Sequence, residues 1–422
     1  MTALRGRCSR APPRRSLALC AEDLTRSGAR EALPAATASQ WAMALLIAAA
    51  GALWAVVIMW DAFEALVLPR RVTRRLRPTR MFYRVTWRVW SAVGRRMGPG
   101  GRRETYLSFF GPLSLLVLMA AWAASLVAAF ALLQTGLGTG LNVSGGGSFT
   151  DHLYLSGETF FTLGLGDVTP VSRAGRALVV IEAGIGFAFL ALVIGYLPVL
   201  YQSFSRREVN ITLLDARAGS PPSAEELLRG DWSDQEALTA LLRDWERWSA
   251  EVLESHLSYP VLSYYRSQHD NQSWLAALTT ILDASALMVV GIPGPGARQA
   301  RLTFAMARHA VVDLTQVLGR APIDSPGDRL PAGDLGRLRT GLAAVGVVVD
   351  GGAGVDDKLA EMRRMYEPFV AALSEYLLMP LPAWRAGEGA RENWRTGPWP
   401  SHAGEDAPAH GLSVPASDCK KE

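Results

Sequence analysis

The run Thr162-Leu163-Gly164-Leu165-Gly166 has the most specific chemistry in this sequence. Its two glycines stand at alternate positions, where glycine permits a positive φ that other residues avoid. With such a backbone, successive carbonyl groups point to one side instead of alternating as they do in a strand. Several rows of this kind around one axis would form a cage of oxygens that replaces the hydration shell of an alkali cation. The sequence therefore predicts a cation filter at residues 162–166.

The segments around this run suit a re-entrant pore loop. Two long apolar segments flank it, a short amphipathic helix at residues 150–161 precedes it, and Asp167 follows it directly. Non-helical backbone at membrane depth is tolerated only where protein or a water-filled cavity surrounds it. The context favours a pore helix leading into a filter over a glycine turn between two anchor helices.

Residues 108–207 resemble the tetrameric potassium channels, most closely the two-helix prokaryotic kind. The motif that carries the resemblance comprises Ser156, Glu158, Thr159, Thr162, Gly164, Gly166, Asp167, Pro170, Val171, Gly175, Arg176 and Gly186. The resemblance implies a homotetramer, no cofactor, and K⁺ coordinated at Thr162, Leu163, Gly164 and Leu165. The sequence departs from the family at Leu165, where the family usually has an aromatic residue that braces the filter. It also departs at Phe161, where the family often has a second Thr.

Two carboxyl groups are expected to support the filter. Glu158 lies four residues before Thr162 on the pore helix, and Asp167 lies directly after the filter. A helix followed by an extended filter would bring both behind the outer mouth, and some prokaryotic channels of the family carry an interacting pair there. Two such carboxyls would share one proton. The alternative is that Asp167 alone faces water and attracts cations.

Three stretches are long and apolar enough to cross about 30 Å of hydrocarbon. They predict a first transmembrane helix at residues 41–68, an outer pore helix at 107–134 and an inner helix at 177–204. The first two flank a basic segment at 69–106, in which twelve arginines and no acidic residue lie between Arg70 and Arg103. The positive-inside rule places this segment in the cytoplasm.

The arginines of the basic segment predict contact with a membrane surface. Arg80, Arg84 and Arg88 share one helix face, and Val85 and Val89 lie on another. This pattern is typical of an amphipathic helix lying on anionic headgroups. A voltage sensor would need its arginines inside an apolar span, so that alternative is disfavoured.

The inner helix predicts a cavity and a gate. Phe187, Leu190 and Ile194 recur on one face and would line an apolar cavity. We expect Gly186 to be a flexible point and Pro198 to kink the helix, with a gate near Gly195 and Pro198. A packing kink without movement is the alternative. Glu182 is an intramembrane carboxyl, which is either functional or a brace behind the pore helix.

After the inner helix, the sequence predicts a linker at 205–222 and an α-helical cytoplasmic domain at 223–381, between disordered tails at 1–40 and 382–422. No glycine-rich nucleotide-binding turn opens the domain, and a ligand of another kind remains open. The domain is not expected to be an enzyme, because no catalytic or metal-binding spacing joins its polar candidates Glu254, His256, His269, Asp270, His309 and Asp313.

The composition adds exclusions. Nearly all basic residues are Arg in a chain rich in Ala and Gly, which indicates a GC-rich genome rather than nucleic-acid binding. The three cysteines, Cys8, Cys20 and Cys419, lie in the tails and predict no disulfide framework.

Together these features predict an all-α membrane protein: a potassium-channel pore domain, one extra transmembrane helix and a helical cytoplasmic domain. The expected function is passive, selective K⁺ conduction across the plasma (inner) membrane, with the C-terminal domain cytoplasmic. Two alternatives remain open: a weakly selective cation channel, and a membrane-tethered helical sensor whose pore is silent.

Overall fold

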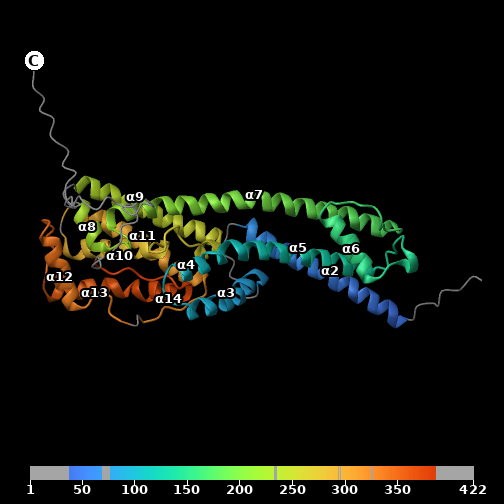
Figure 1. Ribbon diagram of the computed structural model, residues 1–422, viewed down its shortest axis with the longest axis horizontal. Coiled ribbons are helices and arrows are strands. Elements are labelled where there is room, and N and C mark those ends of the chain that lie inside the picture. Colours follow the sequence, from blue (N-terminus) through green and yellow to red (C-terminus); the bar gives the residue numbers. More distant parts are fainter. Residues whose placement is uncertain are drawn as a thin grey trace, which may run out of the picture.

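The computed structural model describes residues 38–68, 77–231, 235–292, 294, 296–324 and 327–385. Most of both predicted tails, and residues 69–76 of the basic segment, lie outside these ranges. The molecule is elongated, with α2, α5 and α6 towards one end, the helical domain at the other, and α7 running along most of the length (Figure 1). Across the described ranges the chain forms helices and no strand, apart from one isolated bridge between Leu141 and Pro170. The all-α fold class is confirmed.

Four of the described helices are long and apolar enough to cross a membrane. Three of them correspond to the predicted spans: α2 (Ala38–Leu66), α5 (Phe110–Gly136), preceded by the short α4 (Gly101–Ser108), and α7 (Arg173–Ala218). The fourth, α10 (Trp274–Gly291), has most of its side chains buried among other helices.

Helices α2 and α5 pack closely because glycine lets their backbones approach. A Cβ added at Gly51 of α2 would lie 2.7 Å from the Ala129 carbonyl oxygen, and one at Gly136 of α5 would lie 2.4 Å from the Ala48 nitrogen. Small residues allow such contacts between helices in lipid, where dispersion and hydrogen bonds provide the association energy. The extra helix α2 is therefore packed against the pore domain.

Two carboxyl groups hold the end of α2 to the chain that follows. Glu64 forms an ion pair with Arg77, with 3.3 Å between its Oε2 and the arginine Nε. Asp61 accepts hydrogen bonds from the Thr79 backbone N–H at 3.1 Å and from the Trp122 Nε1–H at 3.1 Å. These bonds fix the start of α3 (Pro78–Arg96) against α2 and α5.

The predicted linker at 205–222 is wrong over most of its length. Helix α7 continues without a break to Ala218, and only the short stretch from Gly219 to Ser223 separates it from α8 (Ala224–Asp231). The reason is the burial of Ile211, Leu214 and Ala218 against the domain, which extends the helical pattern beyond the membrane span.

The helical domain is built around α10. Its other long helices are α9 (Gln235–Ser258) and α11 (Ala297–Val317), and it also contains α12 (Ala332–Ala343), α13 (Ala353–Arg364) and α14 (Glu367–Leu377). At the centre of α10, the fully buried Asp283 accepts a 2.6 Å hydrogen bond from Arg329 and another from the Tyr366 hydroxyl. Because neighbouring helices cover α10 on all sides, we interpret it as the domain core rather than a span.

Helix α3 is joined to this domain, which the sequence did not predict. Trp87 is buried and donates a 2.9 Å hydrogen bond to the Tyr376 carbonyl oxygen, and its ring contacts Phe110 and Tyr264. The opposite surface of α3 remains exposed, with an apolar row at Met81, Val85, Val89 and Val93 beside the arginines.

Candidate ion pathway

Helix α6 (Phe149–Phe160) leads into the predicted filter. Ser148 begins it with a capping box, in which Ser148 Oγ accepts from the Asp151 N–H and the Asp151 side chain accepts from the Ser148 N–H at 2.7 Å. The carbonyl end of a helix carries partial negative charge, and α6 ends at the filter. An entering cation would therefore meet a favourable potential there.

The filter backbone has positive φ at alternate residues. Thr162 has a φ of 56°, Gly164 of 61° and Gly166 of 78°. The positive φ predicted for the two glycines is confirmed, whereas Thr162 is a non-glycine residue in a conformation that is costly for it. Two hydrogen bonds anchor this segment to α6: Thr162 N–H to the Thr159 carbonyl at 3.0 Å and Leu163 N–H to the Glu158 carbonyl at 2.8 Å.

The segment after the filter is tied to the loop between α5 and α6. The side-chain Oδ1 of Asn142 accepts a 2.7 Å hydrogen bond from the Thr169 N–H. The side-chain Nδ2 of Asn142 donates to the Asp167 backbone carbonyl at 3.3 Å. The Arg176 side chain at the start of α7 donates to the Pro170 carbonyl at 3.2 Å. These contacts fix the outer end of the filter, a role of Asn142 that the sequence did not predict.

Asp167 has a different partner from the one expected. The Tyr154 hydroxyl lies 3.2 Å and 3.1 Å from the two carboxylate oxygens of Asp167. Glu158 is buried on α6, but its Oε2 has no hydrogen-bond partner in the described chain. The expected hydrogen bond between Glu158 and Asp167 is therefore not formed here, and the Tyr154 phenol bonds the Asp167 carboxylate instead.

We expect Tyr154→Phe to lengthen the conducting periods of the pore. The Tyr154 hydroxyl holds the end of the filter towards α6, and losing one hydrogen bond of about 1 kcal/mol corresponds to a change of roughly fivefold. Single-channel recording would measure it. Glu158→Gln, which leaves the Tyr154 bond intact, should change these periods less, and the opposite ranking would restore Glu158 as the partner of Asp167.

Gly186 is a packing position in this structure, and its role as a flexible point stays a prediction. A Cβ at Gly186 would lie 2.0 Å from the carbonyl oxygen of Phe160, the last residue of α6. Gly186 is buried, and α7 is helical on both sides of it. Only glycine allows the inner helix to approach the end of the pore helix this closely.

The predicted cavity and gate residues lie on the uncovered side of α7. Phe187, Leu190 and Ile194 are exposed in the single chain, as are Gly195 and Pro198. The helix continues through Pro198, although proline cannot donate a hydrogen bond to the Ile194 carbonyl. The same side of α7 stays exposed further on, at Val209 and Leu213.

Arg207 fastens α7, just beyond its membrane part, to the helical domain. Its buried guanidinium donates to the carbonyls of Leu262 and Tyr265, each at 3.0 Å, and pairs with Glu208 at 2.9 Å. Its Nη1 also lies 3.2 Å from Nε2 of His256. The sequence did not predict these contacts, because His256, Leu262 and Tyr265 are about fifty residues further along the chain.

We expect Arg207→Ala to lower the stability of the protein by roughly 3 kcal/mol, because it leaves several buried acceptors without a donor. The neighbouring Arg206 is exposed, so Arg206→Ala removes the same charge without breaking a buried contact. Thermal unfolding in detergent would compare the two variants. Equal stability of both would show that the Arg207 contacts contribute nothing.

His256 should make the stability of the helical domain fall at acidic pH. Its Nδ1 lies 2.8 Å from the Val252 carbonyl and must donate to it, so Nε2 is the acceptor for Arg207. Burial, followed by repulsion from Arg207, lowers the pKa of His256 from 6.5 to about 3. Because the folded state binds this proton less readily than the unfolded state, neutral His256 stabilises the fold fully above pH 6.5.

That contribution is lost as the pH falls from 6.5 towards 3, by up to about 1.4 kcal/mol per pH unit. We expect His256→Gln, which cannot titrate, to be less stable at neutral pH and to lose less stability on acidification. Unfolding midpoints measured over this pH range would test it. Parallel pH profiles of the two proteins would contradict the proposed linkage.

The other polar candidates of the domain are not brought together. His309 and Asp313 form an ion pair at 3.4 Å on α11, and Glu254 accepts from Ser258 within α9. Within the described ranges no group of three or more His, Cys, Asp or Glu side chains could hold a metal ion.

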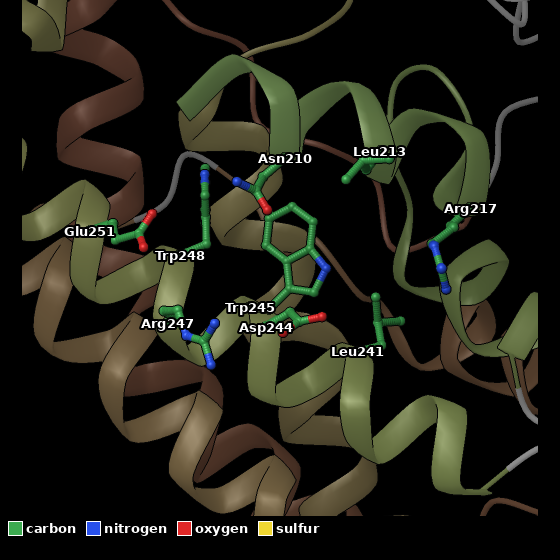
Figure 2. A pocket seen from close by; sticks show the side chains of 9 residues that line it. All are labelled: Asn210, Leu213, Arg217, Leu241, Asp244, Trp245, Arg247, Trp248 and Glu251. Atoms are coloured by element: carbon green, nitrogen blue, oxygen red, sulfur yellow. The ribbon is translucent and has the colours of Figure 1, made fainter. Parts of the chain in front are cut away.

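A groove of about 290 Å³ lies between α7 and α9. Figure 2 shows the Trp245 ring of α9 between residues of the two helices. The groove is lined by acidic, basic and apolar side chains: Asn210, Leu213, Arg217, Leu241, Asp244, Trp245, Arg247, Trp248 and Glu251. A molecule bound there would touch α7 and the domain together.

Comparison with known proteins identifies the pore segment. Residues 114–202 match the family described as "Ion channel", so this part of the chain is an ion-channel pore domain. The chain is also similar to the uncharacterized membrane protein YdjJ of Bacillus subtilis strain 168, with 21% identity over 251 residues, which are 58% of this chain and 72% of that protein. No solved structure matches.

Proposed function

We propose that this protein, a membrane protein with an ion-channel pore domain, is a potassium-selective channel that conducts K⁺ passively. The observation that carries the proposal is the alternation of positive φ at Thr162, Gly164 and Gly166. This backbone turns successive carbonyls to one side, as coordination of a dehydrated cation requires. The carbonyls of Thr162, Leu163, Gly164 and Leu165 would bind K⁺, and no cofactor or catalytic step is needed.

Four copies of the chain would complete the pore. One chain supplies a single row of carbonyls, and its filter residues are exposed when the chain is alone. The uncovered side of α7, with Phe187, Leu190 and Ile194, would then line the cavity, and Gly195 and Pro198 would lie near its inner mouth. A homotetramer places all of these apolar residues around one axis.

We place the protein in the plasma (inner) membrane. The distribution of arginines supports a cytoplasmic position of its basic segment and of its C-terminal domain. Residues 137–148, between α5 and α6, contain no Lys or Arg and would face the outside. The exposed surface of α3 would lie on the membrane. Its arginines would contact anionic headgroups, next to the apolar row of Met81, Val85 and Val89. A regulatory ligand in the groove between α7 and α9 would act directly on the inner helix.

A weakly selective cation channel is the second candidate. Leu165 favours it, because this side chain is 66% exposed in the single chain and no aromatic ring at this position braces the filter. The third candidate is a membrane-tethered sensor with a silent pore. Purified protein in liposomes loaded with K⁺ should take up rubidium and not sodium. Uptake of both ions supports the second candidate, and uptake of neither supports the third.

A further inference from the structure

Glu182 lies outside the ion pathway, between three helices of the pore domain. Its side chain is fully buried on α7. One carboxyl oxygen contacts the Ser156 hydroxyl of α6, and the other lies 3.3 Å from the Gln134 side-chain nitrogen of α5. The outer, pore and inner helices therefore meet at this one carboxyl group.

The hydrogens available at this site determine its protonation. Ser156 Oγ lies 2.8 Å from the Val127 carbonyl oxygen and is also in short contact with Glu182 Oε1. A hydroxyl has one hydrogen, and a carbonyl oxygen has none to donate. If Ser156 donates to Val127, the contact with Glu182 needs a hydrogen on the carboxyl. If an ionised Glu182 takes the Ser156 hydrogen instead, two oxygens face each other at 2.8 Å with no hydrogen between them.

Another buried carboxyl of the membrane part, that of Asp61, provides a contrast. In the described chain the Asp61 carboxylate accepts every hydrogen bond that it forms. The donors are the N–H and hydroxyl of Thr79 and the indole N–H of Trp122. An ionised carboxylate suits that site. Glu182 has no ion pair with any basic side chain in the described part of the chain, and a buried charge without a partner is strongly unfavourable.

We propose that Glu182 is a positioning residue, held as a neutral carboxylic acid, that locks the pore helix α6 to α5 and α7. It donates to Ser156, which in turn donates to the Val127 carbonyl, while Gln134 bonds its other oxygen. One turn further along the same side of α7, Gly186 contacts the end of α6 at Phe160. These two attachments set the position of α6, and α6 carries the filter.

The proposal predicts different effects for two substitutions of similar size. Glu182→Gln keeps a neutral group that donates to Ser156 and accepts from Gln134, whereas Glu182→Leu removes both bonds. We expect Glu182→Gln to retain most of the rubidium uptake, and Glu182→Leu to lose about tenfold and to discriminate less against sodium. This part of the test rests on the proposed channel function.

Infrared spectroscopy tests the protonation without any ion flux. The purified protein should show a carboxylic-acid C=O stretch that is absent in Glu182→Gln and shifted in Ser156→Ala. If the wild type conducts no ions, the proposed function fails while this band still decides the state of Glu182. The absence of a band that depends on Glu182, or a Glu182→Gln variant as impaired as Glu182→Leu, would overturn the proposal.

Discussion

Gly164→Ala is expected to abolish potassium flux while the protein still inserts and assembles. The φ of 61° at Gly164 lies in the left-handed region, where a Cβ costs about 1–2 kcal/mol. An alanine there would relax towards negative φ and turn one carbonyl away from the row. Because every ion would pass that ring of carbonyls in the proposed tetramer, we expect rubidium uptake to fall by about a hundredfold or more.

Gly138→Ala is the matched control for this experiment. Gly138 has almost the same φ, 59°, and also has open space around the added Cβ, but it lies in the loop after α5. The two variants therefore carry the same backbone strain at different places. Normal uptake in Gly164→Ala, or an equal loss in Gly138→Ala, would contradict the assignment of the filter.

Gly186→Ala is expected to be the most disruptive single methyl group on α7. Its Cβ would lie 2.0 Å from the Phe160 carbonyl oxygen, which is backbone and cannot turn aside. Either α7 or the end of α6 must move, which costs roughly 1–3 kcal/mol or more and displaces the start of the filter. We expect lower thermal stability together with at least about a tenfold loss of uptake.

Gly184→Ala adds the same methyl group two residues earlier, where no atom lies within 4 Å of the added Cβ. It should leave stability and uptake almost unchanged. If Gly186→Ala behaves like Gly184→Ala, the close contact between α7 and α6 does not position the filter.

The sequence predicted those parts of the structure that depend on local patterns. The apolar runs predicted α2, α5 and the membrane part of α7, because their lengths and composition alone fix a membrane helix. The alternate glycines predicted positive φ in the filter for the same kind of local reason. Thr162 was not anticipated, because a threonine adopts positive φ only when the surrounding chain forces it.

Contacts between distant segments could not be predicted in the same way. Two arginines in a row, such as Arg206 and Arg207, are typical of the end of a span, so the sequence predicted that the helix ends there. Helix α7 in fact continues, and Ile211, Leu214 and Ala218 have the spacing of one helix face. The burial of Arg207 and of Trp87 depends on partners far along the chain, at residues 262–265 and 376. No local pattern in either segment contains that information.

The candidate site shows the same division. Glu158 and Asp167 were identified by their positions beside the filter, but Tyr154 was missed as the partner of Asp167. The available signal was its spacing, because Tyr154 lies four residues before Glu158 and so shares its side of α6. The choice between an alcohol and a second carboxyl as partner depends on side-chain geometry, which spacing alone does not give.

The most direct test of the central claim is the reversal potential of the purified channel in a planar bilayer, with K⁺ on one side and Na⁺ on the other. A potassium-selective filter at residues 162–166 predicts a reversal potential displaced far towards the potassium equilibrium potential, and loss of the current in Gly164→Ala. A reversal potential near zero would show that the pore does not distinguish the two ions and would contradict potassium selectivity.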